Sequence, residues 1–190
     1  MRKICFALAA LLVSSTAQAD GELDKILSQF DKDRLANFDK TRSEALSEGL
    51  RGAPADVEIL TGALDGKPMP MDSGFDMTGT WKCRVIKVGG LLPLTPYGWF
   101  KCRVTDDGSG WYLEKISGSQ RLTGRFFTES ETRLVFVGAG HVNNDPARKY
   151  GSDPKEDQVA VVTRLGDNKI VLEFPAPQYE SKLDILLMER

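Results

Sequence analysis

The chain has 190 residues, a formal net charge of −2 at pH 7 and a hydrophobic content of 41%. A domain of about 150 residues buries roughly 70% of its unfolded surface, so one domain with a sizeable core is expected. The mild acidity argues against a nucleic-acid binder, which would carry a concentrated basic surface.

The first 19 residues have the order of a secretory signal peptide. Arg2 and Lys3 precede an apolar run over 4–13, and Ala17-Gln18-Ala19 supplies the small residues before the cleavage point. The run of about ten residues is shorter than the roughly 20 that span a bilayer. We expect cleavage after Ala19 and export to the periplasm or the medium. The mature chain would have 171 residues, a charge of −4 and no transmembrane segment.

Cleavage would also remove Cys5 and leave two cysteines, Cys83 and Cys102. An even number of cysteines in an exported chain favours a disulfide, and a pair of reduced buried thiols is the alternative. In the chain-entropy model, closing a loop of this size stabilises the fold by about 3 kcal/mol.

Residues 20–70 are expected to form a helical segment that ends in a proline-containing linker. Apolar residues over 23–50 recur mostly three, four or seven positions apart, which is typical of an amphipathic helix, and Asp31 is a candidate cap for a new start within it. Pro54 suits the first turn of a shorter second helix. We expect both helices, within 22–65, to pack on the rest of the chain because their apolar faces are costly in water.

From Gly79 the hydrophobic pattern has a period of two, and residues 71–190 are expected to form one antiparallel β domain. Short connections of hairpin composition favour an up-and-down barrel or a strongly curled sheet, with a two-sheet sandwich as the main alternative. The polar run over 143–156 predicts a long surface loop. The first of eight expected strands begins at Gly79, and the others lie near 98–105, 110–117, 120–128, 132–138, 158–165, 169–174 and 183–189.

Two repeated tetrapeptides, Lys82-Cys83-Arg84-Val85 and Lys101-Cys102-Arg103-Val104, lie at equivalent places in consecutive strands. If Cys83 lies opposite Cys102, the inner face is apolar and the outer face carries all four cations. Lys82 then lies opposite Arg103, and Arg84 opposite Lys101. Like charges repel, so acidic groups are expected nearby. We favour carboxylates of the helical segment or Glu114 as partners, and an anion-binding patch is the alternative.

Five distinctive strings are spread along the chain: residues 83–89, Phe100-x-Cys102-x-Val104, Gly118-Ser119-Gln120-Arg121 with Gly124, Tyr150-Gly151-x-Asp153, and Glu180-Ser181-x-Leu183-Asp184. Together they resemble the bacterial family named domain of unknown function 4893, over nearly the whole mature chain. The resemblance implies an exported protein and implies no activity. One departure is Trp81, where the family pattern has Tyr more often. Gly79-Thr80-Trp81 also resembles the Gly-x-Trp start of lipocalins, where the Trp closes one barrel end.

Catalytic patterns are sparse in this sequence. The one histidine, His141, lies at the edge of the long loop, and no Gly-x-Ser-x-Gly elbow accompanies it. With the two cysteines paired, thiol catalysis and a Cys/His zinc site lose their ligands. The carboxylates of the long loop lack the alternating spacing of a calcium loop. We therefore expect no catalytic residue, no cofactor and no metal site.

One candidate polar site consists of Arg121, Glu180 and Asp184. Glu180 and Asp184 lie four residues apart in a segment that upstream prolines keep extended. A carboxylate pair suits general acid-base chemistry, as in glycosidases. It equally suits a salt bridge to Arg121 or Arg125, which we favour.

The connection over 89–97 is unusually apolar, and its candidate contact residues are Leu91, Leu92, Leu94, Tyr97 and Trp99. One hypothesis is a module that holds a small or amphipathic ligand in the barrel mouth, with the connections 89–97 and 139–157 as rims. Another is a surface for a partner protein of the cell envelope. A hydrolase built on the candidate polar site ranks below both. Alternatively, the apolar connection folds back and plugs one barrel end.

Overall fold

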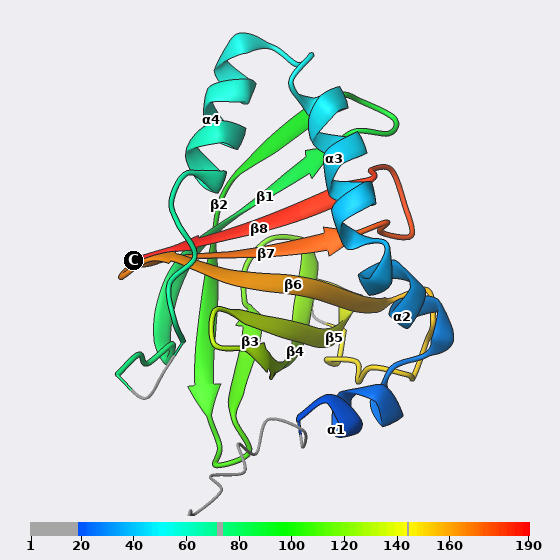
Figure 1. The fold of residues 1–190 in the computed structure, drawn as a ribbon, viewed down its shortest axis with the longest axis vertical. Helices are drawn as coiled ribbons and strands as arrows, with labels where there is room; N and C mark the ends of the chain where they lie inside the picture. Colours follow the sequence, from blue (N-terminus) through cyan, green and yellow to red (C-terminus); the bar gives the residue numbers. More distant parts are fainter. Residues whose placement is uncertain (1–18, 72–73, 144) are drawn as a thin grey trace, which may run out of the picture.

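The computed structural model describes residues 19–71, 74–143 and 145–190, so the predicted signal sequence lies outside the described residues except for Ala19. In this part of the chain, helices precede strands (Figure 1). The elements are α1 (Ala19–Ile26), α2 (Gln29–Ala36), α3 (Phe38–Gly49), α4 (Pro54–Leu64), β1 (Gly79–Val88), β2 (Leu94–Asp106), β3 (Trp111–Lys115), β4 (Gln120–Ser130), β5 (Arg133–Val142), β6 (Asp157–Gly166), β7 (Lys169–Pro175) and β8 (Leu183–Glu189).

The eight strands form a closed barrel in which each strand is antiparallel to its neighbours in chain order and β8 pairs with β1. This confirms the expected up-and-down barrel and excludes the alternative of a two-sheet sandwich. Two strands extend well beyond the expected bounds, and the others differ from them by at most two residues at either end. β2 begins at Leu94, because residues 94–96 pair with the end of β1, and β5 continues to Val142, because its last residues pair with the start of β4.

One end of the barrel is closed by the linker that precedes β1. Phe75 and Met77 are buried there, and Trp81 is only 1% exposed. The indole nitrogen of Trp81 donates a hydrogen bond of 2.9 Å to the carbonyl of Met77. The guanidinium of Arg190 lies 4.1 Å from the centroid of the Trp81 ring and donates to the carbonyls of Asp76 and Thr78. Linker and C-terminus therefore seal this end together.

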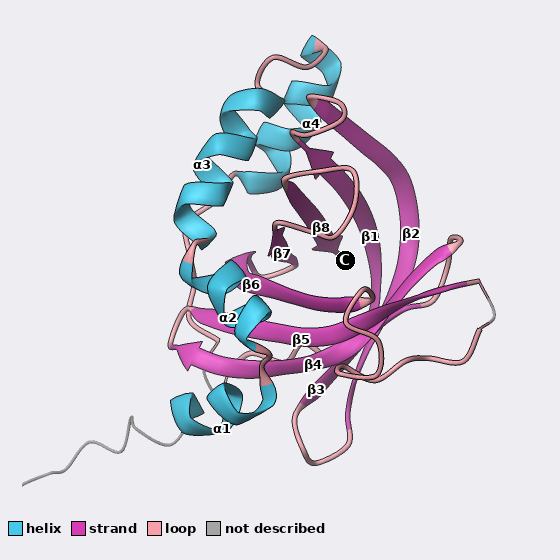
Figure 2. Cartoon of the chain, turned by 90° about the vertical axis from the view of Figure 1, so that its right-hand side faces the viewer, coloured by secondary structure: helices cyan, strands magenta, loops and turns pink. Residues whose placement is uncertain are grey.

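The helices pack on the outside of the barrel and gather on one side of it (Figure 2). α3 and α4 cover a cluster that includes Leu60, Val88 and Leu183 from α4, β1 and β8. α1 and α2 lie against β4, β5 and β6, where buried side chains such as Val137 and Val159 face outward. Strands with apolar residues on both faces therefore lie beneath the helices. More of the residues of β2 and β3 remain exposed to solvent.

The first of the two expected helices is three separate helices, with breaks at 27–28 and at Asn37. The apolar spacing continues across both breaks, which is why periodicity alone did not predict them. The cap of α2 is Ser28, whose hydroxyl accepts a hydrogen bond of 3.2 Å from the backbone N–H of Asp31. The expectation that Asp31 caps this helix was therefore wrong, because Asp31 lies inside α2 and is buried. Pro54 occupies the first turn of α4, as expected.

The sulfur atoms of Cys83 and Cys102 are 2.05 Å apart, in a disulfide. The two residues are diagonal neighbours, since Trp81 lies opposite Cys102 and Cys83 lies opposite Phe100. The expected register was therefore wrong by two residues. A shift of two leaves every side chain on its predicted face, and a Cα–Cα distance of 5.9 Å suits a disulfide, so the apolar inner face is retained.

Candidate functional site

The end of the barrel opposite Trp81 holds a cavity of about 320 Å³. Its floor is apolar and is made by Val85, Leu122, Phe174 and Leu186, while its walls and rim are polar. A second cavity of about 150 Å³ shares Val85, Lys115 and Gln120 with the first and extends toward Tyr97 and Phe100. The open end is therefore a concave, amphipathic site that all strands surround.

Strand alternation decides which charged side chains enter this end. Cys83 on β1, Leu113 on β3 and Leu186 on β8 belong to the interior core. Lys87, Lys115 and Asp184 lie an even number of residues from them on the same strands, so all three side chains belong to the inward-facing series. Charged residues thus replace the apolar ones where the interior meets the mouth.

Lys115 is the most buried cation of the cavity, with 6% of its surface exposed. Its Nζ donates hydrogen bonds to the carbonyls of Ser117 (3.0 Å) and Gln120 (2.5 Å) and lies 4.0 Å from the centroid of the Phe100 ring. Burial, and then the charge of Arg121, lower the pKa of Lys115 to about 8. No carboxylate among the described residues forms an ion pair with it.

Lys87 lies on the other side of the mouth and is neutralised by acidic groups. Its Nζ is 2.6 Å from Oε2 of Glu180 and 4.0 Å from Oδ2 of Asp184. Burial disfavours the charged form of Lys87, but the two carboxylates favour it more strongly, so the pKa of Lys87 is raised. Burial raises the pKa of Asp184, although the hydroxyl of Ser181 donates to its Oδ1 at 2.5 Å. This wall is an ion-pair network, unlike the wall around Lys115.

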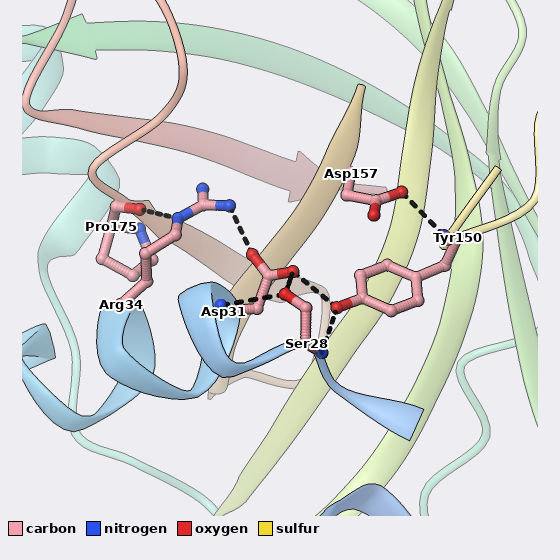
Figure 3. Close-up of polar contacts among 7 residues, drawn as sticks. Ser28, Asp31, Arg34, Tyr150, Asp157 and Pro175 are labelled. Atoms are coloured by element: carbon pink, nitrogen blue, oxygen red, sulfur yellow. Dashed lines mark hydrogen bonds and ion pairs between the residues drawn. The ribbon is translucent and has the colours of Figure 1, made fainter. Parts of the chain in front are cut away.

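Helix α2 holds both loops that form the rim of the mouth (Figure 3). In the connection between β5 and β6, the hydroxyl of Tyr150 accepts a hydrogen bond from the backbone N–H of Ser28 at 3.0 Å and donates one to Asp31 at 2.5 Å. Arg34 donates to Asp31 at 2.9 Å and to the carbonyl of Pro175 at 2.8 Å, just before the connection between β7 and β8. Asp31 is 1% exposed, so one buried network fixes both connections.

Residues 176–182 form a rim that is also held by the turn after β1. Glu180 has a φ of 70°, a region that costs a non-glycine residue free energy, and its carbonyl accepts a hydrogen bond of 2.8 Å from the N–H of Leu91. A Cβ on Gly90 would lie 2.5 Å from that carbonyl oxygen, so only glycine permits the approach. The contact places the carboxylate of Glu180 beside Lys87.

The candidate polar site of Arg121, Glu180 and Asp184 lines the large cavity, so the three residues do share a concave surface. The expected salt bridge to Arg121 or Arg125 was wrong, because both carboxylates face Lys87 and Arg125 pairs with Asp107. The Nε of Arg121 instead donates to the carbonyl of Gly118 at 2.6 Å. Arg121 lies opposite His141 at the rim.

His141 belongs to the last residues of β5 rather than to the loop. Its Nδ1 is buried and has no hydrogen-bond partner among the described residues. Burial, and then Arg121, lower the pKa of His141.

The four cations of β1 and β2 lie on the outer face with a different pairing from the one expected. Lys82, not Arg84, lies opposite Lys101. Arg103 forms an ion pair of 2.7 Å with Glu114, and Lys82 one of 3.1 Å with Glu189. Lys82 and Arg84 also lie 4.6 and 4.5 Å from the centroid of the Trp99 ring. Among the described residues, Glu114 and Glu189 thus neutralise two of the four cations, the Trp99 ring lies against Lys82 and Arg84, and no carboxylate of the helices takes part.

The apolar candidate residues do not act as one group. Leu94 is 7% exposed and packs in the cluster beneath α4, whereas Leu91 and Leu92 are 79% and 58% exposed at the tip. Tyr97 borders the smaller cavity, and Trp99 lies on the outer face. The tip does not plug the barrel, and the rim expected at 89–97 is provided mostly by residues 177–180.

Lys87 and Lys115 were not predicted from the sequence as site residues. A lysine in the inward series of a strand is the signal that could have identified both. This signal identifies a site residue only when the strand is known to end at the open end of the barrel.

Within the described ranges, His, Cys, Asp and Glu side chains form no group of three or more that could hold a metal ion. No described helix is both long and apolar enough to cross a membrane.

Comparison with known proteins identifies a family. The model of the family described as domain of unknown function (DUF4893) matches residues 24–188, which include the helices beyond the start of α1 and the barrel except for the last residue of β8. Neither the curated proteins nor the solved structures contain a significant match. Because the family model spans most of the chain, the protein belongs to the DUF4893 family.

Proposed function

We propose that the protein is an exported, non-catalytic binding module of the bacterial cell envelope that holds a small amphipathic ligand in the open end of its barrel. The cavity of about 320 Å³ carries this proposal. Small-molecule sites are mostly apolar hollows of roughly 300–1,000 Å³ with a few placed polar groups. The apolar floor and polar walls fit that description at its small end.

Four further observations support this function. The signal-like order of residues 1–19 and the disulfide both suit an oxidising compartment outside the cytoplasm. The network around Asp31 holds the rim in place, and a preformed site loses less entropy when a ligand binds. Glu180 and Asp184 converge on Lys87, which suits an ion-pair wall better than the acid-base pair of a hydrolase.

Ligand occupancy can be tested on protein purified from its own periplasm. Native mass spectrometry should detect a co-purified small molecule, or an apolar fluorescent dye should bind with one site. Leu122→Trp fills the floor of the cavity and should abolish binding, whereas Leu92→Trp makes the same change at the exposed tip and should not. Thermal melts establish that both variants fold. Absence of ligand and dye binding in the unchanged protein, or equal binding in both variants, would contradict the proposal.

A second candidate function is contact with a partner protein of the envelope, which the exposure of Leu91 and Leu92 favours. Apolar side chains that remain exposed together at a loop tip often mark interaction sites. A pull-down from envelope extract with the unchanged protein and with Leu92→Asp tests it. Equal recovery of all partners would count against this function.

A further inference from the structure

We infer that the ligand carries an anionic head group, a carboxylate or a phosphate, which the ammonium group of Lys115 binds while a short apolar tail covers the cavity floor. This inference rests on the proposed function and specifies its ligand class. Its basis is the contrast between the two lysines of the mouth.

Lys115 is a buried cation that has no counterion among the described residues. It borders both cavities, and the described residues provide it with carbonyl oxygens and an aromatic ring only. Lys87, in contrast, already has Glu180 and Asp184. A charge removed from water is costly unless it is paired, so an anion in the cavity would offset the cost at Lys115 and gain little at Lys87.

Lys115 also keeps bonding capacity for such a ligand. An ammonium group has three N–H donors, and the carbonyls of Ser117 and Gln120 take two of them. Arg121 adds positive potential on the same side of the mouth and forms no ion pair within the described part of the chain. The head group should therefore lie toward β3 and β4, away from the carboxylates beside Lys87.

The floor defines the other half of the ligand. Val85, Leu122, Phe174 and Leu186 offer an apolar surface, and a volume of about 320 Å³ limits the tail to a short one. Molecules with a charged head and a few methylene groups match both halves. Purely polar anions gain nothing from the floor.

The protonation of Lys115 should control the binding of an anion. With a pKa of about 8, its ammonium form falls from most of the population at pH 7 to a small part at pH 9, so affinity should fall about tenfold across that range. The other titratable groups at the two cavities are Lys87, Tyr97, Arg121, His141, Lys155, Tyr179 and the carboxylates Glu156, Glu180 and Asp184. Burial raises the pKa of Asp184, so its titration requires a control of its own.

Matched small probes test the head group by calorimetry or ligand-observed NMR. Butanoate, butyl phosphate, butan-1-ol and butylamine share a tail and differ in head, and acetate has the head without the tail. At pH 7 an anionic probe should bind at least about tenfold more tightly than butan-1-ol, because a charge-assisted hydrogen bond is stronger than a neutral one. The stronger of butanoate and butyl phosphate identifies the head. Equal affinity for all heads would overturn the inference and leave the proposed function standing, whereas no binding of any probe would overturn both.

Variants locate the effect at one side chain. Lys115→Met should remove the preference for anions and keep the binding of butan-1-ol. Lys101→Met, the same change on the exposed outer face of β2, should leave the preference unchanged. Retention of the anion preference in Lys115→Met would overturn the inference.

The pH profile of the unchanged protein provides a test that does not depend on a variant folding. The ratio of butanoate to butan-1-ol affinity should fall about tenfold from pH 7 to 9, and Asp184→Asn should show the same fall. A constant ratio, or a fall that disappears in Asp184→Asn, would overturn the role of Lys115.

Discussion

The hydroxyl of Tyr150 donates a hydrogen bond of 2.5 Å to the carboxylate of Asp31, joining the connection between β5 and β6 to helix α2. Asp31 also accepts hydrogen bonds from Ser28 and Arg34, and Arg34 reaches the carbonyl of Pro175. The rim of the mouth therefore depends on a buried polar network that begins in the helical segment, so a change far from the cavity should alter it.

Tyr150→Phe should destabilise the protein by about 1–3 kcal/mol, because a buried carboxylate loses a hydrogen-bond donor. Urea unfolding measures the change in free energy. Tyr179→Phe is the matched control, since Tyr179 is 58% exposed and should change stability little. Equal stability of the two variants would contradict the importance of the network.

The low pKa of Lys115 makes stability depend on pH in a defined direction. Between its folded pKa of about 8 and the ordinary lysine value of 10.5, the unfolded chain binds more protons, so this lysine makes folding more favourable as pH rises. The gain across the window should approach about 3 kcal/mol, since one pKa unit corresponds to about 1.4 kcal/mol. The difference in unfolding free energy between the unchanged protein and Lys115→Met, followed from pH 7.5 to 10.5, measures it. A difference that does not vary with pH would show that Lys115 titrates normally.

Loss of the disulfide should destabilise the barrel. Replacing Cys83 and Cys102 by Ser should lower the free energy of unfolding by about 3 kcal/mol in the chain-entropy model, since the crosslink closes a loop with a sequence separation of 19. Denaturant unfolding of oxidised protein, reduced protein and the double variant provides the comparison. The reduced protein should match the double variant, and no difference among the three would refute the expectation.

The outer basic face should affect stability modestly and ligand binding not at all. Arg103 and Glu114 form an exposed pair, and exposed pairs contribute about 0.2–1 kcal/mol. Arg103→Glu should cost about 1 kcal/mol, because it also places two acids together, and Arg103→Glu with Glu114→Arg should recover most of the loss. Thermal melts measure this series. A change in butanoate affinity in the same variants would indicate that the outer face binds anions after all.

The strands were predictable because alternation and turn composition act locally, and from Trp111 onward they agree with expectation apart from the longer β5. The helical breaks were not predictable, since Ser28 and Asn37 interrupt a spacing of apolar residues that continues past them. Glu180 and Asp184 were identifiable as a nearby carboxylate pair. Their partner Lys87 was not, because it is distant in sequence and meets them only when β8 closes the barrel against β1.

Lys115 illustrates the same limit at the candidate site. Its inward direction follows from alternation. Its burial, and its lack of a carboxylate partner in the described part of the chain, depend on the turn that carries Ser117 and Gln120 and on Phe100 from the neighbouring strand. The register of β1 on β2, which places Phe100 opposite Cys83, was the part of the barrel that the repeated tetrapeptides predicted incorrectly.

Titration of isotope-labelled protein with butanoate, followed by amide and methyl NMR shifts, tests the central claim most directly. Binding in the open end of the barrel predicts saturable shifts concentrated at Val85, Lys115, Leu122, Phe174 and Leu186. Shifts concentrated instead at Lys82, Arg84 and Arg103 on the outer face, or no saturable shifts, would contradict it.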